Sequence, residues 1–119
     1  MTENKKIGDR GEAIAKKYLE ESGYTIIASN YRFQHLELDI IAEKDGQLIF
    51  FEVKTRAKNE IDGLDIPLAT RQVRNLKRAV IAYCLQSGND LNSVRLDLIT
   101  ITADRAASLA SLKHYKDIF

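Results

Sequence analysis

Two neighbouring apolar stretches of the chain carry the residue types that phosphodiester chemistry needs. Glu37 and Asp39 lie in the first stretch, and Glu52 and Lys54 lie in the second. Carboxylate oxygens are the ligands that Mg²⁺ and Mn²⁺ prefer, and a cation held by them polarises a phosphoryl group and lowers the pKa of a bound water. A neighbouring lysine could orient or deprotonate that water. These residues therefore predict a metal-assisted hydrolysis of phosphodiesters.

The Asp-Gly pair at residues 45–46 predicts how the two stretches face each other. Asp-Gly favours a two-residue hairpin loop, which places Asp39 opposite Glu52 and Glu37 opposite Lys54. Because side chains alternate along a strand, all four side chains are expected on one face of the hairpin. A three-residue loop would instead shift the register by one residue, so that the charged side chains of the two strands would lie on opposite faces of the hairpin.

Two facing carboxylates repel each other, and three arrangements relieve the repulsion. One carboxylate takes up a proton, or Lys54 pairs with the acids, or a divalent cation binds between Asp39 and Glu52. A set of ordinary cross-strand ion pairs is the structural alternative to a site. The sequence leaves the two interpretations about even, because a carboxylate opposite a carboxylate makes a poor ion pair.

The hydrophobic pattern predicts the elements that position these residues. Apolar residues at helical spacing indicate two helices, Leu109 and Leu112, three residues apart, indicate a weaker third, and runs of β-forming residues indicate four strands. The expected elements are a helix over Asp9–Ser22, strands over Tyr24–Ser29, Leu36–Ala42 and Leu48–Thr55, a helix over Pro67–Ser87 capped by Gly88, a strand over Val94–Thr102, and a weaker helix from Asp104 to about Lys116. This order, αβββαβα, is that of a mixed α/β domain.

Length and composition bound the remaining possibilities. A chain of 119 residues with 45% hydrophobic residues fits one domain over residues 1–119, and its net charge of +1 excludes a uniformly basic nucleic-acid coat. Its one cysteine, Cys84, excludes an intramolecular disulfide framework and is expected in the core. The sequence shows no signal peptide and no apolar run that could span a bilayer, so we expect a cytoplasmic protein without a membrane partner.

The second predicted helix carries a basic stripe. Arg71, Arg74 and Arg78 follow one another at i, i+3 and i+7, and no acid lies between Thr70 and Val80. Such a stripe could neutralise backbone phosphates without reading sequence, although a plain solvated face is the alternative. The predicted nucleic-acid contacts are Arg71, Arg74, Lys77 and Arg78, extended by Arg56 and Lys58.

A series of sequence blocks that covers nearly the whole chain resembles the bacterial YraN family. The blocks are Gly11-Glu12, Asn30-Tyr31-Arg32, Glu37-Leu38-Asp39-Ile40-Ile41, Phe51-Glu52-Val53-Lys54-Thr55-Arg56, Arg95-Leu96-Asp97, and His114 through Phe119. That family is held to be a distant relative of archaeal Holliday junction resolvases, in the PD-(D/E)xK superfamily of nucleases. The resemblance implies a restriction-endonuclease-like fold, with a mixed central β-sheet flanked by helices.

The resemblance also implies roles for individual residues. Asp39 and Glu52 would be metal ligands together with the Val53 carbonyl, and Lys54 would lie beside the attacking water. Glu12 would approach the site from the first helix. Its spacing to the apolar residues of that helix places it at the margin of the buried face, although a carboxylate that stabilises the helix dipole is the alternative.

Three further positions, Glu37, Gln72 and Leu36, can be compared with the family. Glu37 matches the acid of the family's Gly-Glu-Ile-Asp block, and the predicted register gives it a second role in holding Lys54. Gln72 stands near a helical position where the family tends to carry lysine, and Leu36 replaces a glycine that is usual in the family.

His35 and His114 lack a third ligand at metal spacing, so surface or core roles are expected for both.

The combined expectation is a Mg²⁺- or Mn²⁺-dependent endonuclease that acts on DNA, with branched or recombining DNA as one candidate substrate. A homodimer is plausible by analogy, because cutting both strands of a junction needs two sites. Two other functions on the same fold stay open. One is a non-catalytic nucleic-acid-binding module, and the other is a protein-interaction domain.

Overall fold

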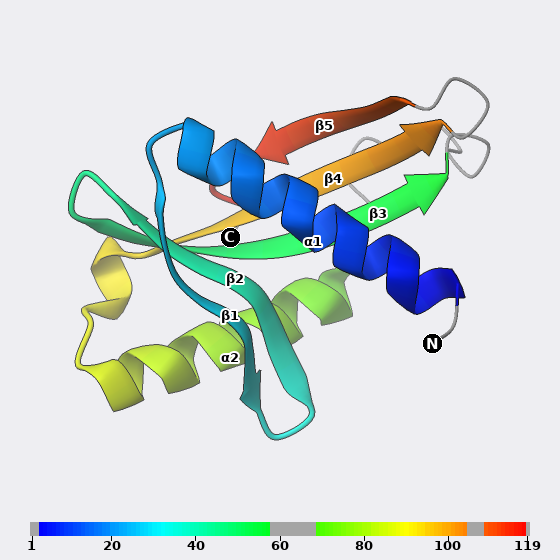
Figure 1. Ribbon diagram of the computed structural model, residues 1–119. Coiled ribbons are helices and arrows are strands. Elements are labelled where there is room, and N and C mark those ends of the chain that lie inside the picture. Colours follow the sequence, from blue (N-terminus) through cyan, green and yellow to red (C-terminus); the bar gives the residue numbers. More distant parts are fainter. Residues whose placement is uncertain (1–2, 58–68, 105–108, 119) are drawn as a thin grey trace.

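A five-stranded mixed β-sheet lies between two helices (Figure 1). The computed structural model describes residues 3–57, 69–104 and 109–118. The elements in chain order are α1 (Glu3–Glu21), β1 (Thr25–Phe33), β2 (Leu36–Lys44), β3 (Gln47–Ala57), α2 (Thr70–Ser87), the short 3₁₀ helix η2 (Leu91–Ser93), β4 (Arg95–Asp104) and β5 (Leu109–Tyr115). No described helix is long and apolar enough to cross a membrane.

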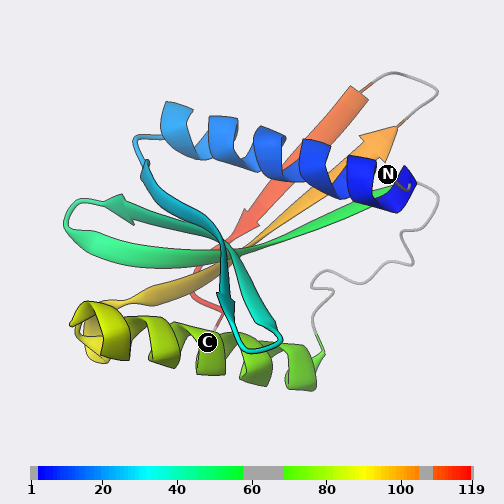
Figure 2. The same cartoon turned by 60° about the horizontal axis from the view of Figure 1, so that its bottom comes forward.

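The strands follow the order β1-β2-β3-β4-β5 across the sheet. β1, β2 and β3 form an antiparallel meander, β3 and β4 run parallel, and β5 returns antiparallel to β4. α2 lies in the crossover that a parallel pair requires. α1 and α2 cover opposite faces of the sheet (Figure 2). The predicted α/β class, with a mixed central sheet flanked by helices, is confirmed.

Each face of the sheet buries its own apolar cluster, because each helix turns one apolar side toward the strands. The α2-side core includes Leu38, Ile41, Phe50, Leu76 and Val80, and it also holds Cys84, as predicted. The α1-side core includes Ala15, Leu19, Ile40, Phe51 and Ile99. Which core a strand residue joins therefore reports the face toward which its side chain points.

The predicted two-residue turn between β2 and β3 is confirmed. Asp45 and Gly46 both have positive φ values, 52° and 78°, as a type I′ hairpin turn requires. The ladder runs over five pairs, from Lys44 opposite Gln47 to the pair of Ile40 with Phe51. The predicted register of the hairpin is therefore correct over this length.

The prediction of a helix over Asp104 to Lys116 is wrong, because residues 109–115 form β5. Residues 105–108 of that range lie outside the described residues. Leu112 packs against the α1-side core and the side chain of His114 is 6% exposed, so alternate residues turn inward. β5 also pairs with the second edge of β4, whose backbone groups need partners. The spacing of two leucines could not reveal this requirement.

The other element boundaries differ only in detail. α1 begins at Glu3, earlier than predicted, and β1 continues to Phe33. Pro67, the predicted start of the second helix, lies outside the described residues, and the described helix begins at Thr70. Gly88 caps the end of α2 in the left-handed conformation at φ 76°, and its N–H donates to the Cys84 carbonyl.

A buried polar network joins β4 to the end of β5 and to α1. The fully buried Asp97 carboxylate accepts from Arg95 Nε at 2.8 Å, Arg95 Nη2 at 2.9 Å, His114 Nε2 at 2.7 Å and the Asp117 N–H at 2.9 Å. Tyr18 on α1 lies 2.8 Å from His114 Nδ1. Burial opposes ionisation of Asp97 most strongly, but the hydrogen bonds from His114 and Arg95 outweigh it and lower its pKa.

α1 crosses β3 at a glycine. A Cβ atom on Gly11 would collide with the Thr55 side chain, so only glycine lets the helix backbone approach the strand this closely. The next residue of α1, Glu12, is thereby carried to β3. In the Gly11-Glu12 block, Gly11 therefore allows the close approach of α1 to β3, and Glu12 supplies the acid.

We expect Gly11→Ala to destabilise the fold by about 1–3 kcal/mol, because the added methyl group has to displace Thr55 or lift α1. Urea unfolding of the variant, of Thr55→Ala and of the double variant measures the effect. Thr55→Ala removes the obstructing atoms, so the double variant should lose less stability than the sum of the single changes. Strict additivity would contradict the proposed collision.

The lowered pKa of Asp97 predicts a loss of stability in acid. A carboxyl whose pKa is lower in the folded than in the unfolded state stabilises the fold above the unfolded pKa, near pH 4. That stability is lost as the pH falls through the folded pKa. Asp97→Asn should therefore cost roughly 2–4 kcal/mol at pH 7 and clearly less at pH 3, by urea unfolding at each pH. An equal cost at both values would rule out this ionic contribution.

Candidate metal and nucleic-acid site

The centre of the candidate site is the point at which β2 separates from β3. The ladder between them ends at the pair of Ile40 with Phe51. One residue beyond this pair, the Asp39 side chain replaces the backbone of β2 as the partner of β3, because its Oδ2 accepts a hydrogen bond of 2.7 Å from the Val53 N–H. Figure 2 shows the end of β1 and the start of β2 bending away from β3 toward α2. Asp39 thus bridges the gap that this bend opens.

The bend interrupts the side-chain alternation of β2. Leu38 and Ile41 both join the α2-side core although they are three residues apart, whereas strict alternation would place them on opposite faces. In β1, the residue across from this break is Asn30, which lies between the paired residues Ser29 and Tyr31 and has a φ of 55°. The two strands therefore bend together.

The bend overturns the prediction that four charged side chains share one face. Glu37 lies between Leu36 and Leu38, which both join the α2-side core, so it faces α1. Glu52 faces α2, in alternation with Phe51 in the α1-side core. The hairpin register alone could not predict this, because it describes an unbent pair of strands. The acids surround the gap from both sides of the sheet.

Glu52 is nearly buried beneath α2. Its exposure is 8%, and its Oε2 accepts a hydrogen bond of 3.1 Å from Gln72 Nε2 near the start of α2. A buried carboxylate is costly without such a partner. The structure therefore brings together Glu52 and Gln72, two of the residues that the sequence analysis selected.

Asp39 is the most perturbed acid of the site, with its pKa raised to about 8. Burial is the largest cause, and the neighbouring Glu52 carboxyl, which shares the proton and repels the charge, comes next. The Val53 N–H and the charge of Lys54 act in the opposite direction. Asp39, Glu52 and Lys54 are thus close enough to influence one another electrostatically.

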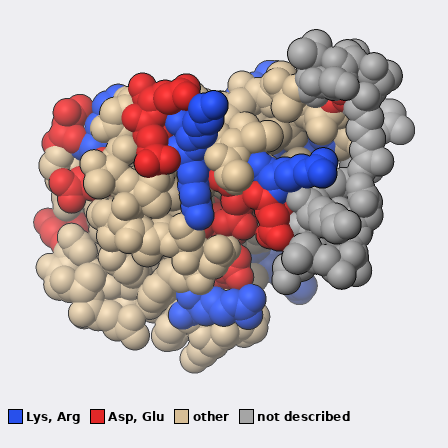
Figure 3. Space-filling view, viewed as in Figure 1, with Lys and Arg blue, Asp and Glu red and all other residues tan. Residues whose placement is uncertain are grey.

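Glu12 and Glu37 lie on the α1 side of the gap. Burial raises the pKa of Glu12, and the charge of Asp39 raises it further. With its amide nitrogen turned toward the acids, Asn30 donates to one oxygen of Glu12 and one of Glu37, both at 3.0 Å. Glu37 also pairs with Arg32 at 3.3 Å, so its partner is Arg32 and not Lys54 as predicted. Figure 3 shows acidic side chains gathered beside α1 with basic ones around them.

The donor set suits a small hard cation held by few protein ligands. Within residues 3–57, 69–104 and 109–118, no three His, Cys, Asp or Glu side chains form a ready metal cage. Mg²⁺, however, is commonly held by one or two carboxylates and keeps several waters. Asp39 and Glu52 provide two mutually repelling carboxylates. The Val53 carbonyl lies at the same strand edge as its N–H, toward the gap.

The basic stripe of α2 faces away from the sheet. Leu76 and Val80 are buried against the strands, so the helical repeat directs Arg71, Arg74 and Arg78 to the opposite side, where all three are exposed. Beside the stripe, a shallow groove of about 320 Å³ is lined by Thr70, Val73, Arg74 and Lys77. Arg56 is partly buried on β3, and Lys58 lies outside the described residues.

Two features of the site were not found by sequence reasoning. The bridge that Asn30 makes between Glu12 and Glu37 was missed, although an asparagine inside a predicted strand is a signal, since asparagine tolerates positive φ. The network around Asp97 was also missed. An aspartate inside the apolar run after residue 95 could have pointed to it, because a buried acid needs partners.

Comparisons with known proteins agree on one family. The sequence model of the "Uncharacterised protein family UPF0102" matches residues 11–101. A "UPF0102 protein" of Christiangramia forsetii is 35% identical over 119 residues, covering 100% of this chain and 98% of the relative. A "UPF0102 protein" of Bacteroides thetaiotaomicron is 37% identical over 123 residues, covering 100% and 96%.

Solved structures give weaker likenesses. An XisH family protein from Nostoc punctiforme has 16% identity and a TM-score of 0.40, over 88% of this chain and 98% of that one. A fdxN element excision controlling factor protein from Anabaena variabilis has 14% identity and a TM-score of 0.42, over 90% and 98%.

The raised pKa of Asp39 predicts an unusual dependence of stability on pH. An acid whose folded pKa is about 8 keeps its proton in the folded state, so its contribution to stability falls as the pH rises from about 4 to 8. Asp39→Asn imitates the protonated acid. Its stability relative to wild type should rise by roughly 1–3 kcal/mol between pH 5 and pH 8, by urea unfolding without divalent cations. A difference that stays constant would contradict the shift.

Proposed function

The chain belongs to the uncharacterised protein family UPF0102, the YraN family of the sequence analysis, and from this premise we propose that it is a divalent-cation-dependent endonuclease acting on DNA. The observation that carries the proposal is the contact of Asp39 with the Val53 N–H beside Glu52. It brings the separated acids and the lysine of the Asp39, Glu52-Val53-Lys54 signature to one point of the sheet.

Asp39, Glu52 and the Val53 carbonyl would hold Mg²⁺ or Mn²⁺. The cation, when bound, would polarise a phosphoryl group and lower the pKa of a water. The protein supplies two carboxylates whose mutual repulsion would favour a cation between them, and Asp39 would give up its proton when such a cation binds. Gln72 orients Glu52 through its hydrogen bond, which leaves one carboxylate oxygen, Oε1, for a ligand.

Lys54 and the acids on the α1 side complete the proposed machinery. The charge of Lys54 acts on Asp39, and we assign Lys54 the role of orienting or deprotonating the attacking water. Glu12 acts on Asp39 from the other side of the gap, and we assign it a role in water or cation binding. Glu37, held by Arg32 and Asn30, positions Glu12 through the amide bridge.

The partner that we propose is DNA, with branched or recombining DNA as one candidate substrate. The exposed stripe of α2, Arg71, Arg74 and Arg78, would bind backbone phosphates without reading sequence, and Lys77 and Arg56 would add to it. Arg71 and Gln72 are adjacent at the start of α2, and Gln72 contacts Glu52. A DNA strand bound along the stripe would therefore reach Glu52 by passing around this end of the helix. A homodimer would provide the second site for cutting two strands. We place the protein in the cytoplasm.

Cleavage assays test the proposal on end-labelled linear, single-stranded, flap and four-way-junction DNA with Mg²⁺, Mn²⁺ or EDTA. Wild type should cut at least one substrate with a cation and none in EDTA. Asp39→Ala, Glu52→Ala and Lys54→Ala should each lower the rate at least about a hundredfold. Glu43→Ala is the matched control, because Glu43 is an exposed acid of the same strand β2 outside the site, and it should keep the wild-type rate.

Failure would take a specific form. A folded Asp39 or Glu52 variant that cuts at the wild-type rate would remove these residues from the site. Absence of cutting by wild type on every substrate, together with salt-sensitive DNA binding that Arg74→Ala weakens, would favour a non-catalytic nucleic-acid-binding module. The exposed stripe of α2 is the observation that supports this second function.

A further inference from the structure

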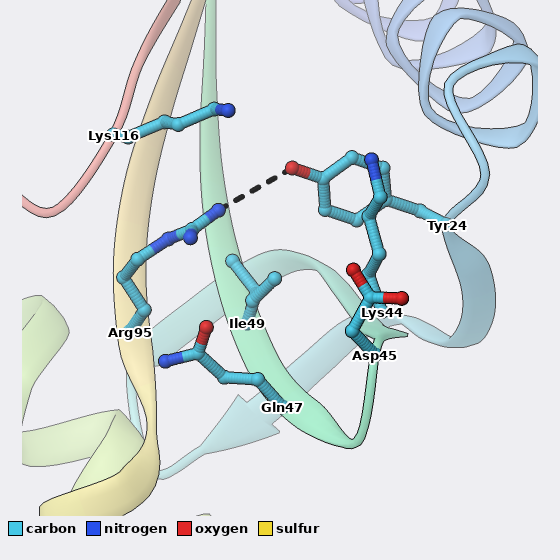
Figure 4. A pocket seen from close by; sticks show the side chains of 7 residues that line it. All are labelled: Tyr24, Lys44, Asp45, Gln47, Ile49, Arg95 and Lys116. Carbon is cyan, nitrogen blue, oxygen red and sulfur yellow. Dashed lines mark hydrogen bonds between the residues drawn. The ribbon is translucent and has the colours of Figure 1, made fainter.

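A polar pocket lies on the α1 face of the sheet, at the opposite end of β3 from Lys54. Its volume is about 190 Å³. The residues that line it are Tyr24, Lys44, Asp45, Gln47, Ile49, Arg95 and Lys116 (Figure 4). None of Glu12, Asp39, Glu52 and Lys54 lines this pocket, so it is separate from the candidate nuclease site.

Three elements each contribute one cation to the pocket. Lys44 comes from the end of β2, Arg95 begins β4, and Lys116 follows β5. In Figure 4 the Lys116 side chain extends over the space between Arg95 and Tyr24. Within the described parts of the chain Lys116 has no ion pair or hydrogen bond, so its three ammonium hydrogens are available to a ligand.

The other two cations are held in place and keep unused donors. Arg95 is fixed through Nε and Nη2 on Asp97, and Nη2 also donates to the Tyr24 hydroxyl at 3.3 Å. Among the residues that the structure describes, no group accepts a hydrogen bond from its Nη1, so the two hydrogens there can contact a ligand. Lys44 lies over the Tyr24 ring, 4.8 Å from its centroid, and donates to the Ser22 carbonyl at 2.8 Å. A ligand would therefore meet groups that are already ordered.

Charge and size together indicate the class of ligand. The pocket holds three cations against the lining acid Asp45 and the buried Asp97 that pairs with Arg95, which leaves an excess of one positive charge. A volume of about 190 Å³ is below the roughly 300–1,000 Å³ of pockets that enclose drug-sized ligands. Gln47 adds a side-chain amide whose Nε2 donates one hydrogen to the Ser93 carbonyl at 3.5 Å and carries a second hydrogen. The ligand that fits is therefore small, anionic and rich in hydrogen-bond acceptors, and a phosphate group has these three properties.

We propose that this pocket binds a phosphate group, supplied either as a free phosphate or phosphomonoester or as a phosphate of a nucleic-acid strand. Lys116 and Arg95 Nη1 contact its oxygens, and Lys44 and Gln47 close the side nearest the β2–β3 turn. The proposal does not rest on the endonuclease function, because it uses neither Asp39 nor Glu52.

NMR titration with sodium phosphate tests the pocket at pH 7, in EDTA and at constant ionic strength with sodium chloride. We expect saturable shifts in the Gln47 side-chain amide, the Arg95 Nε–H and the Lys116 backbone amide. Lys116→Ala should weaken binding about tenfold, which corresponds to the loss of one charge-assisted contact. Lys113→Ala is the matched control, because Lys113 is an exposed lysine of β5 outside the pocket, and it should bind like wild type.

Hexathymidylate with a 5′-phosphate and with a 5′-hydroxyl distinguishes the two sources. Shifts from inorganic phosphate and the phosphorylated oligomer alone identify a terminal or free phosphate. Equal shifts from both oligomers identify backbone phosphates. The proposal is overturned if chloride reproduces the shifts, if none of the three probes produces them, or if Lys116→Ala binds as tightly as wild type. None of these readouts involves cleavage, so failure of the nuclease proposal would leave them unaffected.

Discussion

The hydrogen bond from the Val53 N–H to Asp39 organises the candidate site. Where β2 leaves β3, a backbone donor in the middle of the sheet loses its strand partner, and a buried unpaired N–H is costly. The Asp39 carboxyl replaces that partner and is drawn into the sheet as a result. Its burial beside Glu52 then follows from backbone geometry, and the raised pKa follows from its burial. The bend of the strands, the paired Val53 N–H and the raised pKa of Asp39 are therefore linked.

The sequence predicted the parts of the fold that local rules govern. The Asp45-Gly46 turn, the register up to Ile40 and Phe51, and the cap of α2 at Gly88 depend on residues close in the chain. The contact of Gln72 with Glu52 agrees with the place that the family resemblance indicated. Two predictions failed because distant partners decide the outcome. Glu37 turns toward α1 because β1 and β2 bend together, and residues 109–115 form a strand because β4 offers an unpaired edge.

Two regions of the sheet carry different electrostatic environments. Around the gap, repelling acids keep a proton on Asp39 in the absence of a cation. Around Asp97, cationic and polar donors outnumber the single acid, so that the carboxylate stays ionised even though it is completely buried. The same side chain type is thus set to opposite protonation preferences within one small sheet, and the difference comes from its hydrogen-bond partners. The first environment favours the neutral acid, and the second favours the ionised carboxylate.

The parallel pairing of β3 with β4 also sets an order for folding. α1 and the meander of β1, β2 and β3 are made of consecutive segments, so they can associate while the rest of the chain is still being synthesised. β4 begins only at Arg95, after the whole of α2, and the contacts of β3 with it are long-range. Until β4 arrives, one edge of β3 stays open to pairing with other chains. α2 covers one face of the meander through Leu76 and Val80. We therefore expect α2 to pack on the meander before β4 pairs with β3, and this packing should shorten the time for which the edge of β3 is unpaired.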